Sequence, residues 1–163
     1  MSDRPSALSK ADFLARFGPV YEASPWVAEA VWPDPPDERQ ALADAMRVVV
    51  DGAPREMKLA LIRAHPELAS RTKMADASVK EQSGAGLDRC SPDEFAAFQR
   101  LNAAYNARFG FPFIVAVKGL TRGDILAAFE ARLANDPQTE FEAAITQIHR
   151  IAGFRLTDVF EGS

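Results

Sequence analysis

The stretch that decides the fold class is residues 91–110, SPDEFAAFQRLNAAYNARFG. It opens with the capping pattern S-x-x-E, in which the Ser91 side chain accepts a hydrogen bond from the third helical amide and Glu94 reaches back to the Ser91 amide. Apolar side chains then recur at intervals of three and four residues, which is the spacing of one helix face. Gly110 is the residue type that most often ends a helix. The stretch therefore predicts one complete, well-capped α-helix.

The same apolar spacing continues along most of the chain, whereas the strict alternation typical of strands is nearly absent. Prolines and capping residues divide the pattern into further helices, with Asp37 and Ser78 as the expected N-terminal caps of two of them. These helices are expected at about residues 9–17, 24–32, 37–51, 54–64, 78–84, 121–134 and 136–160. We therefore predict an all-α protein that forms a single compact multi-helix domain over residues 1–163.

One segment breaks the helical pattern. Residues 111–117, FPFIVAV, are apolar and include a proline, so we expect a short extended segment that is buried. An extended backbone leaves amide groups that no helical hydrogen bond consumes, and such amides can donate to a ligand. The other interpretation is plain hydrophobic packing, and the sequence pattern does not separate the two.

Composition and charge exclude several classes of partner. The chain has 163 residues, 47% of them hydrophobic and 26% charged, which is enough for a globular core without disulfides or metal. Its net charge is −4 and its basic residues are scattered, so nucleic acid is not an expected partner. No apolar run approaches the roughly 20 residues of a membrane span. The N-terminus carries no apolar leader and the single Cys90 suits a reducing compartment, so we expect a cytoplasmic protein.

Metal-ligating residues are too few for a metal site. The chain has two histidines, His65 and His149, and one cysteine, Cys90, and their spacing matches no zinc motif. His65 precedes Pro66, which disfavours helical geometry at His65 and so predicts a helix end there. At that place His65 either satisfies terminal carbonyl groups or performs chemistry. A nucleophilic pair of Cys90 with His65 is the weaker hypothesis.

Two further polar features have both a structural and a functional interpretation. The pattern from Ser78 to Glu81 repeats the S-x-x-E of residues 91–94, so it is either a second helix cap or part of a site. Arg155 lies on the apolar line of the last predicted helix. An arginine there must extend to solvent, pair with a carboxylate or bind an anion, because an unpaired buried charge costs several kcal/mol.

Four motifs in this order resemble the family of 2-oxo-4-hydroxy-4-carboxy-5-ureidoimidazoline (OHCU) decarboxylases. The motifs are His65-Pro66-Glu67-Leu68-Ala69, Ser78-x-x-Glu81-Gln82 with Ala85-Gly86-Leu87, Phe109-Gly110-Phe111-Pro112-Phe113-Ile114, and Phe154-Arg155-Leu156. The resemblance extends from about Phe13 to Val159. It implies an all-α homodimer, free of cofactor and metal, that converts the small molecule OHCU to (S)-allantoin and carbon dioxide in urate breakdown.

The resemblance also implies roles for individual residues. His65, Glu81 and Arg155 match the family's catalytic residues, with His65 as the proton donor or acceptor. The positions that match its substrate-binding residues are Pro66, Ser78, Gln82, Phe113, Ile114, Val115, Ala116 and Val117. The loop after Ala69 looks shorter than in many members of the family.

These residue types fit a decarboxylation without a cofactor, because the substrate's own ring can accept the electrons released with carbon dioxide. A histidine that titrates near neutral pH can then deliver a proton from one face, as a chiral product requires. The alternative is a non-enzymatic all-α interaction domain, in which His65 and Glu81 are caps and Arg155 belongs to a structural ion pair.

Overall fold

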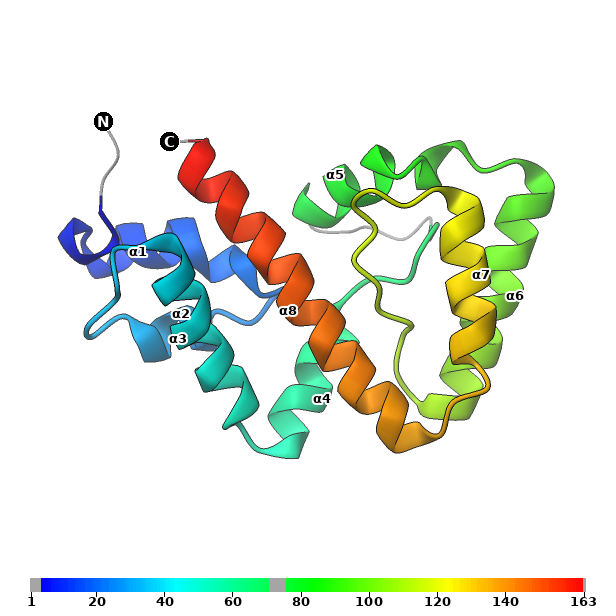
Figure 1. Cartoon of the computed structure of the whole chain (residues 1–163), viewed down its shortest axis with the longest axis horizontal. Coiled ribbons are helices and arrows are strands. Elements are labelled where there is room, and N and C mark those ends of the chain that lie inside the picture. Colours follow the sequence, from blue (N-terminus) through cyan, green and yellow to red (C-terminus); the bar gives the residue numbers. More distant parts are fainter. Residues whose placement is uncertain (1–3, 71–75, 163) are drawn as a thin grey trace. The chain divides into compact units, whose positions relative to one another are not determined.

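The computed structural model describes residues 4–70 and 76–162, and its regular structure is helical (Figure 1). Within these residues no strand is present, which confirms the predicted all-α class. The α-helices are α1 (Lys10–Phe17), α2 (Trp26–Val31), α3 (Arg39–Asp51), α4 (Arg55–Ala64), α5 (Asp76–Gly84), α6 (Pro92–Phe109), α7 (Arg122–Arg132) and α8 (Pro137–Glu161). Short 3-10 turns are η1 (Pro5–Ala7), η2 (Gly18–Val20) and η3 (Leu87–Arg89).

The chain forms two compact units. One contains the residues up to Ala64 and those from His149 onward, and the other contains the residues from His65 to Ile148. Helix α8 therefore supplies residues to both units. The single domain expected over residues 1–163 stays a prediction. None of the described helices combines the length and the apolar character that crossing a membrane requires.

Side chains close to the helix ends explain most of the helix boundaries. The Ser91 hydroxyl accepts from the Glu94 amide and the Glu94 carboxylate accepts from the Ser91 amide, which confirms the predicted capping box of α6. Thr121 and Asp124 form a second such box at the start of α7. Gly110 ends α6 at φ 77°, in the left-handed region that glycine adopts without steric cost. These contacts span only a few residues, so the sequence alone predicts them.

The predicted cap of α3 is wrong. Glu38, and not Asp37, accepts a hydrogen bond from the Ala41 amide at 2.7 Å. The Asp37 carboxylate instead accepts from the Ser6 amide at 2.8 Å, which connects the N-terminal segment to the start of α3. Asp37 is the better capping type by preference, and a contact distant in sequence overrides that preference.

The predicted cap of α5 is also wrong. Helix α5 extends from Asp76, so Ser78 lies inside it and cannot be its N-cap. Ser78 is buried. The simple capping interpretation of the pattern from Ser78 to Glu81 is thereby excluded. The shortened loop expected after Ala69 continues into residues 71–75, which lie outside the described residues.

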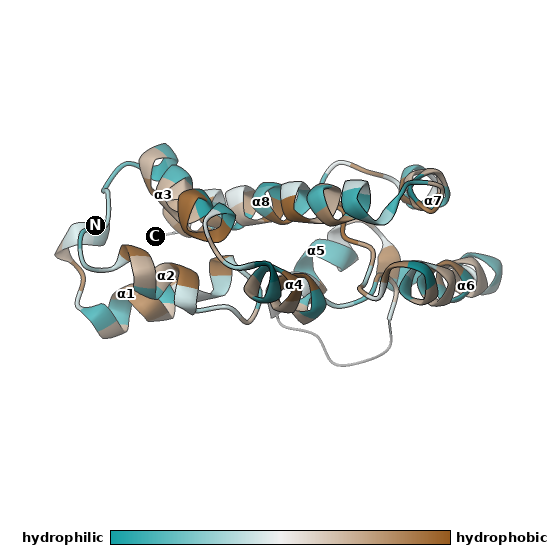
Figure 2. Cartoon of the chain, turned by 90° about the horizontal axis from the view of Figure 1, so that it is seen from below, coloured by the Kyte–Doolittle hydropathy of each residue, from teal (hydrophilic) through white to brown (hydrophobic). Residues whose placement is uncertain are grey.

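Aromatic rings fill the core of the unit from His65 to Ile148. The Tyr105 ring centroid lies 4.5 Å from that of Phe109 and 5.4 Å from that of Phe113, and Phe113 stacks on Phe129 at 4.0 Å. Tyr105 belongs to α6 and Phe129 to α7, two helices that lie side by side (Figure 1). Apolar and polar residues are interspersed along α6 and α8, as amphipathic helices require (Figure 2). The rings therefore connect α6 and α7 with the non-helical segment that contains Phe113.

A fully buried carboxylate, that of Glu140 on α8, adds a polar centre to this core. Its exposed fraction is 0%. It accepts hydrogen bonds from the Tyr105 hydroxyl at 2.5 Å, from Arg132 Nε at 2.9 Å and from the Asn135 side chain at 2.7 Å. Burial and the bond to Glu140 raise the pKa of Tyr105, so its hydroxyl stays protonated and donates. The buried charge is thus paired and hydrogen-bonded, as its burial requires.

We predict that Glu140→Gln lowers the free energy of unfolding by about 3 kcal/mol, because it leaves the Arg132 charge without its buried partner. Urea unfolding followed by circular dichroism measures the change. The matched control is Glu130→Gln, since the Arg100–Glu130 pair lies 4.0 Å apart with both side chains more than 60% exposed. Glu130→Gln should lower the free energy of unfolding by less than about 1 kcal/mol. Equal losses in the two variants would contradict a special role for the buried pair.

Candidate active site

His65 is the first residue after α4 and is buried, with 7% of its surface exposed. Pro66 follows and disfavours the helical conformation at His65. The structure therefore confirms the predicted helix end. His65 is thus buried and lies directly before the loop that follows α4.

That loop, residues 67–69, is held by amide side chains from two helices. Gln82 on α5 accepts from the Ala69 amide at 2.9 Å and donates to the Glu67 carbonyl at 3.2 Å. Asn102 on α6 donates to the Leu68 carbonyl at 3.0 Å. Asn102 is not among the residues predicted from the sequence, although a polar residue next to Leu101 on the buried face of α6 is a signal for it.

Helix α5 carries the other polar residues of the predicted site. Ser78, Glu81 and Gln82 are spaced by three and four positions, so they lie on the same face of the helix. Ser78 and Gln82 are buried and Glu81 is partly exposed. The Ser78 hydroxyl and the Glu81 carboxylate are groups of the kind that donate and accept hydrogen bonds, whereas the Gln82 amide is bonded to the loop.

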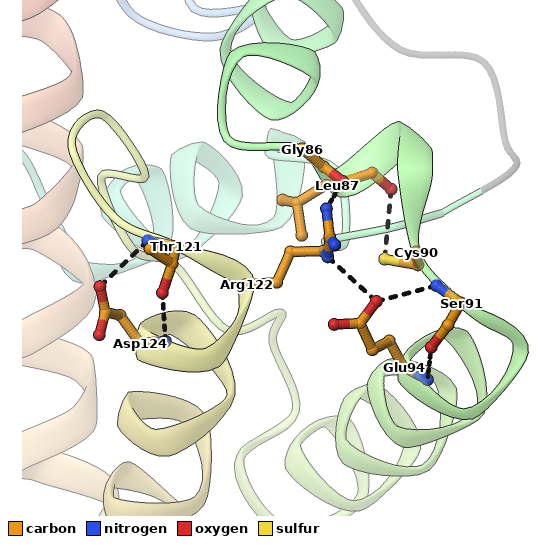
Figure 3. A network of polar contacts seen from close by, with 8 residues as sticks. All are labelled: Gly86, Leu87, Cys90, Ser91, Glu94, Thr121, Arg122 and Asp124. Atoms are coloured by element: carbon orange, nitrogen blue, oxygen red, sulfur yellow. Dashed lines mark hydrogen bonds and ion pairs between the residues drawn. The ribbon is translucent and has the colours of Figure 1, made fainter.

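The C-terminal end of α5 is held by Arg122, which lies between Gly86 and Glu94 (Figure 3). Arg122 Nη1 donates to the Gly86 carbonyl at 3.1 Å and Arg122 Nε donates to Glu94 at 3.0 Å. Gly86 has a φ of 81°, and a Cβ atom there would lie 2.7 Å from Arg122 Nη1. The bonds from the Ser91 amide and Arg122 lower the pKa of Glu94. Glu94 therefore has a structural role, in contrast to the role expected for Glu81.

The segment from Phe113 to Val117 lies outside the helices and is largely buried, as predicted. Arg132 donates to the Ile114 carbonyl at 2.5 Å, and its guanidinium carbon lies 4.4 Å from the centroid of the Phe113 ring. The Ala116 amide donates to the Gln147 side chain at 2.9 Å.

The other amides of this segment are not bonded in this way. Those of Phe113, Ile114, Val115 and Val117 have no hydrogen-bond partner among residues 4–70 and 76–162. The side chains of the segment pack in the core, as the packing interpretation expects, and a ligand-binding role of its amides stays a prediction.

Arg155 forms a buried ion pair. Its Nη2 lies 2.9 Å from Glu22 Oε1, with exposed fractions of 7% and 5% for the two side chains, and its Nη1 donates to the Pro19 carbonyl at 3.2 Å. Of the three alternatives that the sequence left open for this arginine, the structure shows pairing with a carboxylate. No spacing in the sequence connects Glu22 with Arg155, so the partner itself was missed.

The other nucleophile and metal candidates have structural explanations. His149 Nδ1 lies 2.8 Å from the Tyr21 hydroxyl and His149 Nε2 lies 2.9 Å from Asp51, so both ring nitrogens are occupied. Burial lowers the pKa of His149 despite the bond to Asp51. Burial raises the pKa of the Cys90 thiol, which argues against a reactive thiolate. No group of three or more metal-ligating side chains occurs in the described part of the chain.

The structure brings most of the predicted site residues into one compact unit. His65, Pro66, Ser78, Glu81, Gln82 and Phe113 to Val117 all belong to the unit from His65 to Ile148. Arg155 belongs to the other unit, where Glu22 and Pro19 are its partners.

Comparison with known proteins identifies similar sequences along nearly the whole chain. The model of the OHCU decarboxylase family matches residues 6–157. A 2-oxo-4-hydroxy-4-carboxy-5-ureidoimidazoline decarboxylase of Haloferax volcanii is 46% identical over 149 residues, which cover 91% of this chain and 89% of the relative. The uric acid degradation bifunctional protein of Bacillus subtilis is 44% identical over 143 residues, or 87% of this chain and 29% of that protein.

A solved structure supports the same relationship. The crystal structure of an (S)-allantoin synthase superimposes with a TM-score of 0.79 at 32% sequence identity. The match covers 96% of this chain and 52% of that chain, so the present chain spans about half the length of that protein.

We predict that Arg155→Met lowers the free energy of unfolding by about 3–5 kcal/mol, because it leaves the Glu22 carboxylate buried without its charge partner. The double variant Arg155→Met with Glu22→Leu should recover most of this loss, since it removes both charges together. Urea unfolding of the two single variants and the double variant measures the coupling. Additive losses would contradict the ion pair as the main stabilising contact of Arg155.

Proposed function

The chain belongs to the OHCU decarboxylase family, and we propose that it catalyses the decarboxylation of OHCU to (S)-allantoin and carbon dioxide in urate breakdown. It is a carbon-carbon lyase with a small-molecule substrate. The observation that carries this assignment is the family match over residues 6–157, which includes all four motifs, together with 46% identity to a decarboxylase of that name.

In the proposed mechanism His65 moves the proton. The bond between the ring carbon and the carboxylate breaks, carbon dioxide leaves, and the electron pair is delocalised into the substrate's ring. A proton then has to reach carbon from one face for a single enantiomer to form. His65 is buried and fixed at the start of a held loop, which suits delivery from one direction.

The remaining residues bind and orient the substrate in this proposal. Glu81 accepts hydrogen bonds from ureido and ring N–H groups, and Ser78, on the same helix face, supplies a hydroxyl. The unpartnered amides between Phe113 and Val117 donate to carboxylate and carbonyl oxygens as negative charge develops there. Pro66 lies next to the ligand by its place after His65. Arg155 is proposed as a third catalytic residue on the strength of its motif, Phe154-Arg155-Leu156.

The resemblance also supports three further proposals about the working enzyme. It acts as a homodimer, and it uses neither a metal nor an organic cofactor, because the reacting ring itself accepts the electrons. A cytoplasmic location suits its single cysteine.

The alternative of a non-enzymatic interaction domain has lost part of its basis. That interpretation made His65 and Glu81 helix caps and Arg155 a member of a structural ion pair. Glu81 lies inside α5, so it does not cap the start of that helix, whereas the ion pair of Arg155 with Glu22 agrees with the alternative.

The test of the proposed function is turnover of OHCU generated in place from urate. We expect the protein to accelerate OHCU decay and to give optically active allantoin, measured by circular dichroism, whereas spontaneous decay gives a racemic product. In His65→Ala the rate should fall by about 10²- to 10⁴-fold, which is the usual contribution of general acid-base catalysis. The unfolding midpoint of the variant serves as the control for folding. A folded His65→Ala variant with normal turnover would exclude the proton-transfer role.

Glu81 and Glu94 provide a matched pair, because each is the fourth residue of an S-x-x-E pattern in the same unit. Glu81→Gln should reduce turnover strongly, since a neutral amide is a weaker acceptor for ureido and ring N–H groups. Glu94→Gln should leave turnover unchanged and reduce stability only, because Glu94 is bonded to Ser91 and Arg122. Steady-state kinetics and urea unfolding separate the two outcomes. Equal loss of turnover in both variants would refute the substrate-binding role of Glu81.

A further inference from the structure

Three successive residues after the His65-Pro66 pair have backbone groups bonded to side-chain amides. The Glu67 carbonyl and the Ala69 amide bind Gln82, and the Leu68 carbonyl binds Asn102. Because a loop lacks the internal hydrogen bonds of a helix, these bonds determine its conformation. We propose that Gln82 and Asn102 are positioning residues, which hold residues 67–69 between α5 and α6 and thereby fix the orientation of His65. The inference rests on the proposed role of His65.

The contacts of Gln82 favour this role over substrate binding. Its carbonyl oxygen and its amide nitrogen are both bonded to the loop backbone. Its side chain is buried, with an exposed fraction of 6%. Gln82 thus acts on the reaction through the loop, and not as one of the substrate-binding residues that the family motif suggested.

The backbone conformation at Ala69 gives a reason why the loop has to be held. Ala69 has a φ of 55°, in the left-handed region that residues with a Cβ atom rarely adopt. Such a conformation persists only where its surroundings impose it. The hydrogen bond from the Ala69 amide to Gln82 is such a restraint. Without it the loop is expected to relax, and a displacement of about 1 Å at a catalytic group is enough to lower a rate by about 100-fold.

The Asn102 side chain provides independent evidence. It is 3% exposed, and its Oδ1 is buried with no hydrogen-bond partner among the described residues. If the Asn102 amide were turned by 180°, Oδ1 would face the Leu68 carbonyl, and two acceptors cannot form a hydrogen bond. The bond to Leu68 therefore determines the orientation of the amide. A buried acceptor without a donor is destabilising. An amide on the buried face of α6 is therefore unfavourable for packing, and the bond that holds Leu68 explains its presence.

The experiment compares Gln82→Met, Gln82→Glu and Asn102→Leu with the control Asn106→Ala. Asn106 is one turn further along α6, and it binds the Glu67 side chain and not the loop backbone. In Gln82→Met and Asn102→Leu we expect kcat to fall by about 10- to 100-fold, while the Kd of (S)-allantoin, used as a ligand that does not react, changes by less than about twofold. Gln82→Glu keeps the acceptor for the Ala69 amide, so its kcat should fall less than that of Gln82→Met. Asn106→Ala should keep kcat within about twofold.

A second readout does not depend on turnover. The chain contains only two histidines, so proton NMR shows two imidazole Hε1 signals, and His149 is an internal control in the unit that does not contain the loop. Gln82→Met and Asn102→Leu should shift the His65 signal and leave the His149 signal in place. Asn106→Ala should shift neither.

The outcomes separate this inference from the proposed function. An unchanged His65 signal in folded Gln82→Met and Asn102→Leu overturns the positioning role, and so does a Kd of allantoin that rises as much as kcat falls. Adding Gln82→Met to His65→Ala should cause no further loss of turnover, because both changes act through the same group. Absence of OHCU turnover in the unmodified protein contradicts the proposed function, and full turnover in His65→Ala contradicts only the proton-transfer role of His65. In both cases the NMR comparison still tests whether the two amides hold His65.

Discussion

The buried pair of Glu140 and Arg132 is the interaction on which the unit from His65 to Ile148 depends most. Glu140 has no exposed surface and accepts hydrogen bonds from α6 through Tyr105 as well as from Arg132 at the end of α7. Arg132 in turn donates to the Ile114 carbonyl and lies over the Phe113 ring. One charge pair therefore connects three helices with the segment whose amides are proposed to face the substrate. Because each charge is buried or nearly so, neither can be removed without leaving the other unpaired.

The two non-helical segments of the proposed site share a structural principle. Neither residues 67–69 nor residues 113–117 have the repeating backbone hydrogen bonds of a helix, so side chains satisfy part of their backbone groups. Gln82 and Asn102 do so for the first segment, and Arg132 and Gln147 do so for the second. The two segments differ in the backbone groups that remain without a hydrogen-bond partner. In the second segment several amides remain as donors, which is the arrangement that binding of negatively charged oxygens requires.

Polar groups in the core also illustrate a conflict between stability and function. Asn102 leaves a buried oxygen without a donor, and Ala69 adopts a backbone conformation that a residue with a Cβ atom avoids. Ala69 belongs to the loop that follows His65, and Asn102 binds that loop. Local features that are unfavourable for stability tend to gather at functional sites, where the surrounding structure compensates for them. Arg155 is different, because its buried charge has a carboxylate partner in Glu22.

The sequence by itself determined the helical class, most of the helix boundaries and the order of the motifs that identify the family. These features depend on contacts within a few residues, such as the Ser91–Glu94 capping box, or on the spacing of apolar side chains along one helix. The location of His65 at a helix end follows in the same way from Pro66.

Only the tertiary structure decided which partner each buried polar group has. Glu22 with Arg155, Glu140 with Arg132 and Asn102 with the Leu68 carbonyl are far apart in sequence or lie on different elements, and no local pattern predicts such pairs. The same reason explains the error at Asp37, which binds Ser6 instead of capping α3. Ser78 lies in a helix that begins earlier than its capping pattern suggested. The preference of one residue type over another at a helix cap is worth about 1 kcal/mol, so a single long-range contact is enough to override it.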